Sequence, residues 1–394
     1  MKTNYNRTVQ ACFIGYVVQA IVNNFVPLLF LTFQGSYGIS LQKITLLVTF
    51  NFGIQLLVDL ASIGFVDRIG YRASMILAHA MAAAGLILLT VLPERLGDPF
   101  VGLLIAVMIY AIGGGLLEVL VSPVVEACPT DNKEKAMSLL HSFYCWGHVG
   151  VVLLSTLFFR IFGIANWKYM ALVWALIPIA NGILFIRVPI APLLDEGEKG
   201  LTMGELFKKK IFWVLMLMML CAGASEQAVS QWASTLAEKS FGINKTIGDL
   251  AGPMVFAILM GSSRAFYGKF GDKINLERFI QYSAVLCMVS YLMIAFIPVP
   301  ALGILGCAVC GLSVGIMWPG TFSMAAASVK RGGTALFAFL ALAGDVGCSS
   351  GPTYVGMISG ALNDNLKLGI FAALIFPVLM IMGIKMIGSL QKYD

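Results

Sequence analysis

The stretch Gly113-Gly-Gly-Leu-Leu-Glu118-Val-Leu-Val-Ser-Pro123-Val-Val-Glu126 lies inside an apolar segment that runs from about residue 100 to residue 127. An apolar segment of this length predicts a membrane-spanning helix. Glu118 falls a little past its middle, where an ionised carboxylate costs about 2.5–3.5 kcal/mol. We therefore expect Glu118 to face a protein cavity, a partner or a proton path, and the rest of the chain to enclose it.

The composition is that of a membrane protein. Of the 394 residues, 59% are hydrophobic and only 12% are charged, against about 25% charged in soluble domains. The eight cysteines lie in or at the ends of apolar segments, so we interpret them as packing residues and not as a disulfide framework. The sequence has no phosphate-binding loop and no metal-ligand spacing, which argues against an enzyme, an ATP-driven pump and a cofactor.

Twelve segments are long and apolar enough to span a membrane, which predicts an all-α membrane protein of two six-helix bundles. The predicted domains are an N-terminal bundle at 1–188, a cytoplasmic linker at 189–209 and a C-terminal bundle at 210–394. The predicted helices are 10–34, 41–66, 72–92, 99–127, 133–162, 166–187, 210–240, 246–270, 276–298, 301–326, 333–360 and 366–388.

The lysines and arginines predict the orientation. With both termini in the cytoplasm, most of the 26 basic residues fall in cytoplasmic segments, as the positive-inside rule requires. They gather at helix ends, so we interpret them as topology signals and not as a nucleic-acid surface. We expect a multi-pass, monomeric protein of the inner membrane, in contact with lipid.

The two halves carry matching turns. The turn after the second helix contains Asp67-Arg68-Ile-Gly70-Tyr71-Arg72, and the turn after the eighth contains Gly271-Asp272-Lys273. Each half thus places an aspartate and then a base at the inner membrane surface, six helices apart. Parallel repeats of this kind are found in one large class of transporters.

The first of these turns resembles the loop signature of the major facilitator superfamily, although Gly64 stands three residues before the aspartate where that family has four. The resemblance covers the whole chain and implies that the loop charges hold a gate closed until the halves rock. The alternative is that they only fix the topology. The gate residues it implies are Asp67, Arg68, Arg72, Asp272 and Lys273.

Several short segments also resemble the fucose–galactose–proton symporter group of that superfamily. These include Val22-Asn23-Asn24-Phe25, Leu117-Glu118-Val119 and Ala224-Ser-Glu226-Gln227. Pro27 stands where that group has an acidic residue three positions after the asparagine pair. If that acid carries the proton in the group, this chain couples through another residue or not at all.

Polar residues from several helices fall near the middle of their segments, where transporters bind their solutes. Amides both donate and accept hydrogen bonds, which suits sugar hydroxyl groups, and tryptophan rings can stack on a sugar. The alternatives are interhelical hydrogen bonds for the amides and packing or lipid contact for the rings. The candidates for solute binding are Gln19, Asn23, Asn24, Glu118, Trp146, Glu226, Gln227, Gln231, Trp232 and Trp318.

Proton coupling has its own candidates. Burial disfavours the charged form of Glu118, which favours loading and release of a proton, and a static ion pair with Arg264 is the alternative. Arg264 cannot lose its proton, so we expect it to pair with Asp345 or Glu226. The proton-coupling candidates are Glu118, Glu226, Asp345, Arg264 and His141.

The sequence thus predicts a secondary transporter that moves a small polar solute, such as a monosaccharide, by alternating access, with protons as a candidate coupling ion. Efflux of drugs or metabolites is the alternative within the class, which the 20 methionines keep open. A transport-inactive membrane sensor is the alternative from another class.

Overall fold

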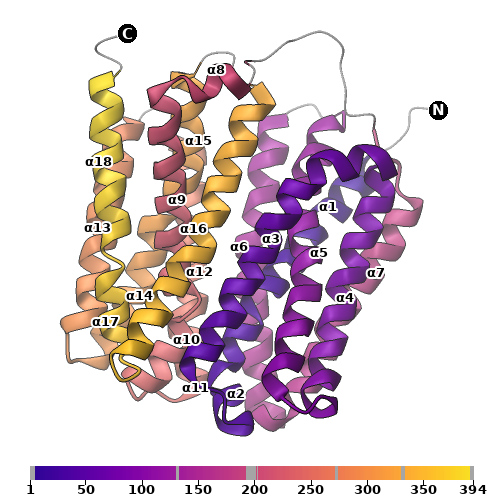
Figure 1. Ribbon diagram of the computed structural model, residues 1–394, viewed down its shortest axis with the longest axis vertical. Helices are drawn as coiled ribbons and strands as arrows, with labels where there is room; N and C mark the ends of the chain where they lie inside the picture. Colours follow the sequence, from indigo (N-terminus) through magenta and orange to yellow (C-terminus); the bar gives the residue numbers. More distant parts are fainter. Residues whose placement is uncertain are drawn as a thin grey trace. The chain divides into compact units, whose positions relative to one another are not determined.

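A computed structural model describes residues 5–129, 133–191, 201, 203–270, 274–329 and 333–390. These residues are largely helical and include no strand. The chain divides into two compact units, Met1–Asp195 and Glu196–Asp394. The division falls inside the predicted linker 189–209, which also contains one short helix, α8 (Met203–Phe207). The helices of each unit run side by side along a common direction (Figure 1).

In the first unit, the core helix α1 packs on α5, α6 and α7, while α5 packs on α3 and α4. This unit contains α1 (Asn6–Asn24), η1 (Val26–Leu29), α2 (Phe30–Tyr37), α3 (Leu41–Ile69), α4 (Tyr71–Arg95), α5 (Pro99–Ala127), α6 (Lys133–Phe162), η2 (Ile164–Asn166) and α7 (Trp167–Arg187).

In the second unit, the core helix α9 packs on α15, α16 and α18, while α14 packs on α12 and α13. The remaining elements of this unit are α9 (Lys210–Ser230), α10 (Ala233–Thr235), η3 (Leu236–Ser240), α11 (Lys245–Asp249), η4 (Leu250–Met254), α12 (Val255–Phe270), α13 (Leu276–Phe296), α14 (Pro300–Val314), α15 (Met317–Ser328), α16 (Gly333–Ala361), α17 (Leu366–Ala372) and α18 (Ile375–Leu390).

The predicted all-α membrane fold is confirmed. Among the described residues, eleven of the predicted segments correspond to helices that are long and apolar enough to span a membrane, when short interruptions are counted as part of the helix. The twelfth, predicted at 333–360, is the continuous 29-residue helix α16. The eight cysteines are free and buried in the two cores.

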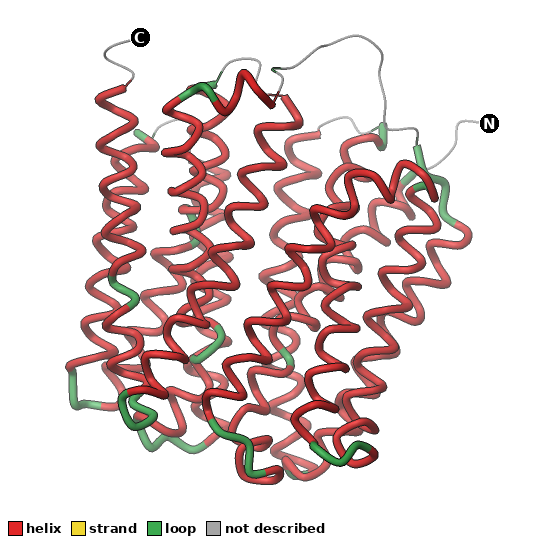
Figure 2. Tube along the Cα trace, in the orientation of Figure 1, coloured by secondary structure: helices red, strands yellow, loops and turns green. Residues whose placement is uncertain are grey.

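Five predicted helices differ from the prediction because they are interrupted. Short turns divide the spans of α9–α10, α14–α15 and α17–α18 (Figure 2). A 3₁₀-helical segment divides α1–α2, and a wider π-helical segment divides α11–α12. Pro27 and Pro319 explain two of the breaks, because proline lacks the N–H that a helix needs to bond the carbonyl four residues earlier. The first spanning helix of each unit is therefore discontinuous next to its predicted polar residues.

Close packing of backbones holds α9 against α16. A methyl group added at Gly347 would overlap the carbonyl of Leu220, and one added at Gly351 would lie 2.5 Å from the carbonyl oxygen of Ala224. Small residues at helix contacts let membrane helices approach closely. This contact fixes the part of α9 that directly precedes Glu226.

Candidate functional site

The first unit contains a buried amide cluster, formed by Asn23, Asn51 and Gln55. Asn23 is one residue from the end of α1, and the other two lie one turn apart on α3. The oxygen Oδ1 of Asn23 accepts hydrogen bonds from Nδ2 of Asn51 at 3.1 Å and from Nε2 of Gln55 at 2.8 Å. All three side chains are buried. The sequence analysis placed Asn23 among the binding residues but did not include its two partners.

A second contact joins α1 to α5. Nε2 of Gln19 donates to Oε2 of Glu118 at 2.7 Å, and the hydroxyl groups of Tyr16 and Ser122 lie 2.9 Å apart one turn away. Glu118 is half-buried. The acid on which the sequence analysis centred therefore holds an amide of the neighbouring helix, one turn from the amide cluster.

Both contacts in this unit have acceptor oxygens left over. The side-chain oxygens of Gln19, Asn51 and Gln55 are buried and have no hydrogen-bond partner among the residues that the structure describes. A buried acceptor without a donor costs about 1–3 kcal/mol. Three such atoms near one helix break leave acceptors that a donor from outside the described residues could satisfy.

The other candidates of the first unit lie away from the amide cluster. Nδ2 of Asn24 bonds to the Ala20 carbonyl of its own helix at 2.9 Å and to the Tyr144 hydroxyl at 3.4 Å. His141 is exposed and lies against the ring of Tyr16. Trp146 is 52% exposed. Of these, His141 is within reach of the Tyr16–Ser122 contact, and Asn24 acts as a bond between α1 and α6.

In the second unit, Arg264 of α12 pairs with Glu226 of α9, with 3.0 Å between Nη2 and Oε2. The sequence analysis left Asp345 and Glu226 open as partners, and the ion pair forms with Glu226. Its side chains are 19% and 9% exposed, so little water screens their charges. Nε of Arg264 also donates to the carbonyl of Gly315 at 3.3 Å.

Pro319 explains why the carbonyl of Gly315 is free of a helical hydrogen bond and can accept from Arg264. In a regular helix, Gly315 would receive the N–H of residue 319, which proline lacks. The break between α14 and α15 follows from this loss, and the carbonyl at the C-terminal end of α14 attracts a cation. The Trp318-Pro319 pair thus positions the guanidinium through the backbone.

A row of amides continues from Glu226 along α9. Nε2 of Gln231 donates to Oε1 of Gln227 at 3.0 Å, and Nε2 of Gln227 donates to Oε1 of Glu226 at 3.3 Å. All three are buried at the point where α9 ends. The arrangement directs hydrogen bonds toward the carboxylate and brings three of the predicted binding residues together.

The tryptophans of this unit differ from the expected sugar platforms. Trp232 is fully buried, and its indole N–H donates to the carbonyl of Pro352 at 3.0 Å, so it offers no ring face to a solute in this conformation. Trp318 is half-buried, and its ring packs on Gly344, next to the buried Asp345. Trp318 therefore remains a candidate, whereas Trp232 anchors α16.

Among the predicted gate residues, Arg72 has a defined contact. Its Nη1 donates to the carbonyls of Phe185 and Ile186 at 2.8 and 2.9 Å, which caps the C-terminal end of α7. Asp67 and Arg68 belong to α3, but their side chains lie outside the described part of the structure. Asp272 and Lys273 lie outside the described residues.

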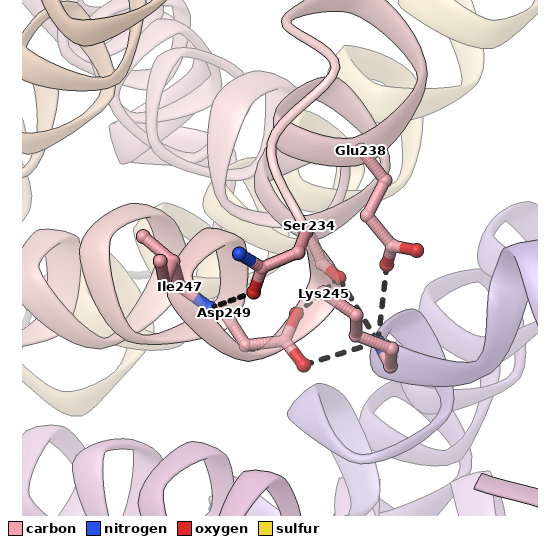
Figure 3. Close-up of polar contacts among 6 residues, drawn as sticks. Ser234, Glu238, Lys245, Ile247 and Asp249 are labelled. Atoms are coloured by element: carbon pink, nitrogen blue, oxygen red, sulfur yellow. Dashed lines mark hydrogen bonds and ion pairs between the residues drawn. The ribbon is translucent and has the colours of Figure 1, made fainter. Parts of the chain in front are cut away.

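A partly buried ionic cluster that was not predicted from the sequence is formed by Ser234, Glu238, Lys245 and Asp249. The ammonium of Lys245 lies 3.0 Å from Oδ2 of Asp249 and 3.3 Å from Oε1 of Glu238, and the hydroxyl of Ser234 donates to Asp249 (Figure 3). It joins α10 and η3 to α11. The signal was the spacing of four between Lys245 and Asp249, which puts both on one helix face.

A buried histidine in the first unit was also missed. Nδ1 of His79 lies 2.7 Å from the Met75 carbonyl, so it carries the proton, and Nε2 then accepts from Nδ2 of Asn181 at 2.8 Å. The same Nδ2 donates to the Ala11 carbonyl at 2.9 Å. This network joins α1, α4 and α7 and is separate from the amide cluster.

Comparison with known proteins decides the family. The family model of the Major Facilitator Superfamily matches residues 12–352. The chain belongs to this superfamily. This superfamily consists of transporters and not of enzymes, and the resemblance seen in the loop signature is confirmed.

This facilitator has distant relatives. It is 24% identical over 279 residues to the membrane protein MosC of Rhizobium meliloti. The aligned region covers 70% of this chain and 64% of MosC. The chain thus spans less than two thirds of the length of the curated relative it matches.

Solved structures show the same fold. A bacterial homologue of the human lysosomal transporter Spinster has a TM-score of 0.77 at 14% identity, covering 98% of this chain and 97% of the other. A D-xylose–proton symporter has a TM-score of 0.77 at 14% identity, and the match covers 97% of this chain and 96% of the other. The fucose–proton symporter FucP of E. coli has a TM-score of 0.66 at 14% identity, and the match covers 97% of this chain and 99% of the other.

Proposed function

We propose that this facilitator moves a small polar solute, of the size and hydroxyl content of a monosaccharide, across the inner membrane by alternating access, with both termini in the cytoplasm. The observation that carries the proposal is the pair of helix breaks. In both units, the first spanning helix stops beside buried amides, at Asn23 in α1 and at Gln227 and Gln231 in α9. Transporters bind solutes and ions at such breaks in discontinuous helices.

The chemistry of the side chains favours a hydroxylated solute. The amide cluster and the Gln227–Gln231 row offer both donors and acceptors, and a sugar hydroxyl group needs both. Two of the solved structures with this fold are sugar–proton symporters by name, which adds support. Efflux of apolar drugs fits less well, because buried polar groups next to an apolar solute would stay unpaired.

We assign proton coupling to Glu118, and we propose that the solute or a proton disturbs the Glu226–Arg264 pair. A half-buried carboxylate held by one amide loses little when it is protonated, because the carboxyl group can still accept from Gln19. Glu226 instead faces a guanidinium that always carries its charge, and this charge favours the ionised form of the acid. The two acids thus have different environments, which suits a proton carrier at Glu118 and a counter-ion of Arg264 at Glu226.

The test is uptake of labelled monosaccharides by proteoliposomes that contain the purified protein. We expect at least one sugar to accumulate when the outside is acidic and only to equilibrate without a gradient. Glu118→Gln should abolish accumulation while sugar exchange between the two sides continues, since exchange needs no net proton movement. The absence of flux for every sugar would contradict the proposed solute, and accumulation by Glu118→Gln would contradict the role of Glu118.

A further inference from the structure

The polar residues around the break in α1 include buried acceptor oxygens that no described residue supplies with a donor. The amide N–H₂ groups of Asn51 and Gln55 both donate to the single side-chain oxygen of Asn23. Their own oxygens, and that of Gln19, remain without a donor in the described part of the chain. These side chains are 5%, 1% and 3% exposed, so bulk water does not reach them.

The orientation of Gln19 is fixed by chemistry. Its neighbour Glu118 accepts through Oε2 at 2.7 Å, and an ionised carboxylate can only accept. Exchanging the nitrogen and oxygen of Gln19 would place two acceptors in contact. The oxygen of Gln19 is therefore an acceptor in addition to those of the amide cluster, and Glu118 adds a negative charge one turn away.

The three helices that carry these residues supply no lysine or arginine near them. Helix α5 contains no lysine or arginine, α1 has only Arg7 in its first turn, and α3 has Lys43 and Arg68 at its two ends. The membrane-spanning parts of these three helices thus combine two carboxyl groups, those of Glu118 and Asp59, with the three unmatched amide oxygens. A ligand that fits them donates more hydrogen bonds than it accepts and carries positive charge.

From this imbalance we propose that the solute is an amino sugar, with a protonated primary amine that binds at Glu118 and the oxygens of Gln19, Asn51 and Gln55. A hydroxyl group donates one hydrogen bond and brings two further lone pairs, whereas an ammonium donates three and accepts none. A charge-assisted bond to a carboxylate is also about twice as strong as a neutral one. The inference rests on the proposed function, because it specifies the solute of the same site.

The experiment compares matched sugars on the purified protein at pH 7, with dissociation constants taken from the rise in thermal stability with ligand concentration. The probes are D-glucosamine and D-galactosamine, the parent sugars D-glucose and D-galactose, and the two N-acetyl derivatives. We expect an amino sugar to bind about tenfold more tightly than its parent or its N-acetyl form. Glu118→Gln should reduce that ratio toward one, whereas Asn181→Leu, which alters a buried amide outside the cluster, should preserve it.

The outcomes separate this inference from the proposed function. If a parent sugar binds as tightly as its amino sugar or more tightly, the proposed amine on the solute is overturned, but the monosaccharide proposal stands. Ordered water would then be the donor to the unmatched oxygens. Binding of none of the six sugars would overturn both proposals. An amine preference that survives Glu118→Gln would overturn the placement of the amine.

Discussion

Replacing Arg264 by methionine is expected to abolish transport and to destabilise the second unit by about 3–5 kcal/mol. The change leaves the Glu226 carboxyl group buried without its counter-charge, because the side chains of the native pair are only 19% and 9% exposed. It also leaves the Gly315 carbonyl without the guanidinium that replaces the missing N–H of Pro319. Uptake and the thermal midpoint of the same preparation would measure the two losses.

A double variant separates stability from function. Glu226→Met combined with Arg264→Met removes both charges and fills a similar volume, so stability should return close to that of the native protein. Transport should not return, because the charges are needed by the solute or the proton and not by the fold. Arg278→Met, at an exposed position at the start of α13, serves as the control and should change neither quantity. Normal uptake by the double variant would contradict a transport role for the pair.

The second large effect is expected at the ionic cluster. Lys245→Met leaves the carboxylate of Asp249, whose side chain is fully buried, and that of Glu238 to repel each other. Breaking a buried pair costs about 3–5 kcal/mol, and the 20% exposure of Lys245 places the loss toward the lower end of that range. Denaturation of the purified protein in detergent would measure it, and Lys245→Met with Asp249→Asn should recover most of it.

Lys239 provides a matched control in the same region. It pairs with Asp364 at 3.1 Å, but those side chains are 31% and 39% exposed. Exposed pairs contribute about 0–1 kcal/mol, so Lys239→Met should change stability by less than that. Equal losses from Lys239→Met and Lys245→Met would contradict the structural role assigned to the cluster.

The fold was predictable because length and hydropathy alone define a membrane helix. The bilayer requires about 20 apolar residues, and each of the twelve predicted segments is found as helix. The positions of the helix breaks were harder to predict from the sequence. Pro27 and Pro319 gave a local signal, whereas the break at Gln231 and Trp232 has none, since neither residue is a helix breaker.

The candidate site was predictable as a set of residues but not as a set of contacts. Depth in the membrane selected Asn23, Glu118, Glu226 and Arg264, because a polar group in an apolar segment needs a reason to be there. Pairing depends on which helix faces meet, and that is decided by packing between distant segments. The sequence therefore left two partners open for Arg264 and treated Lys245 as a topology marker.

The central claim is that the amide cluster of the first unit recognises the solute, and a comparison of two asparagines tests it most directly. Asn51 and Asn181 are both buried in this unit, at 5% and 2% exposure, but only Asn51 belongs to the cluster. The measurement is the KM for sugar uptake by proteoliposomes, per amount of folded protein, for Asn51→Leu and Asn181→Leu. We predict that Asn51→Leu raises KM about tenfold, as expected when a buried hydrogen-bonding group is lost, while Asn181→Leu leaves KM unchanged and lowers only stability. An unchanged KM for Asn51→Leu, or the same rise for both variants, would contradict the account.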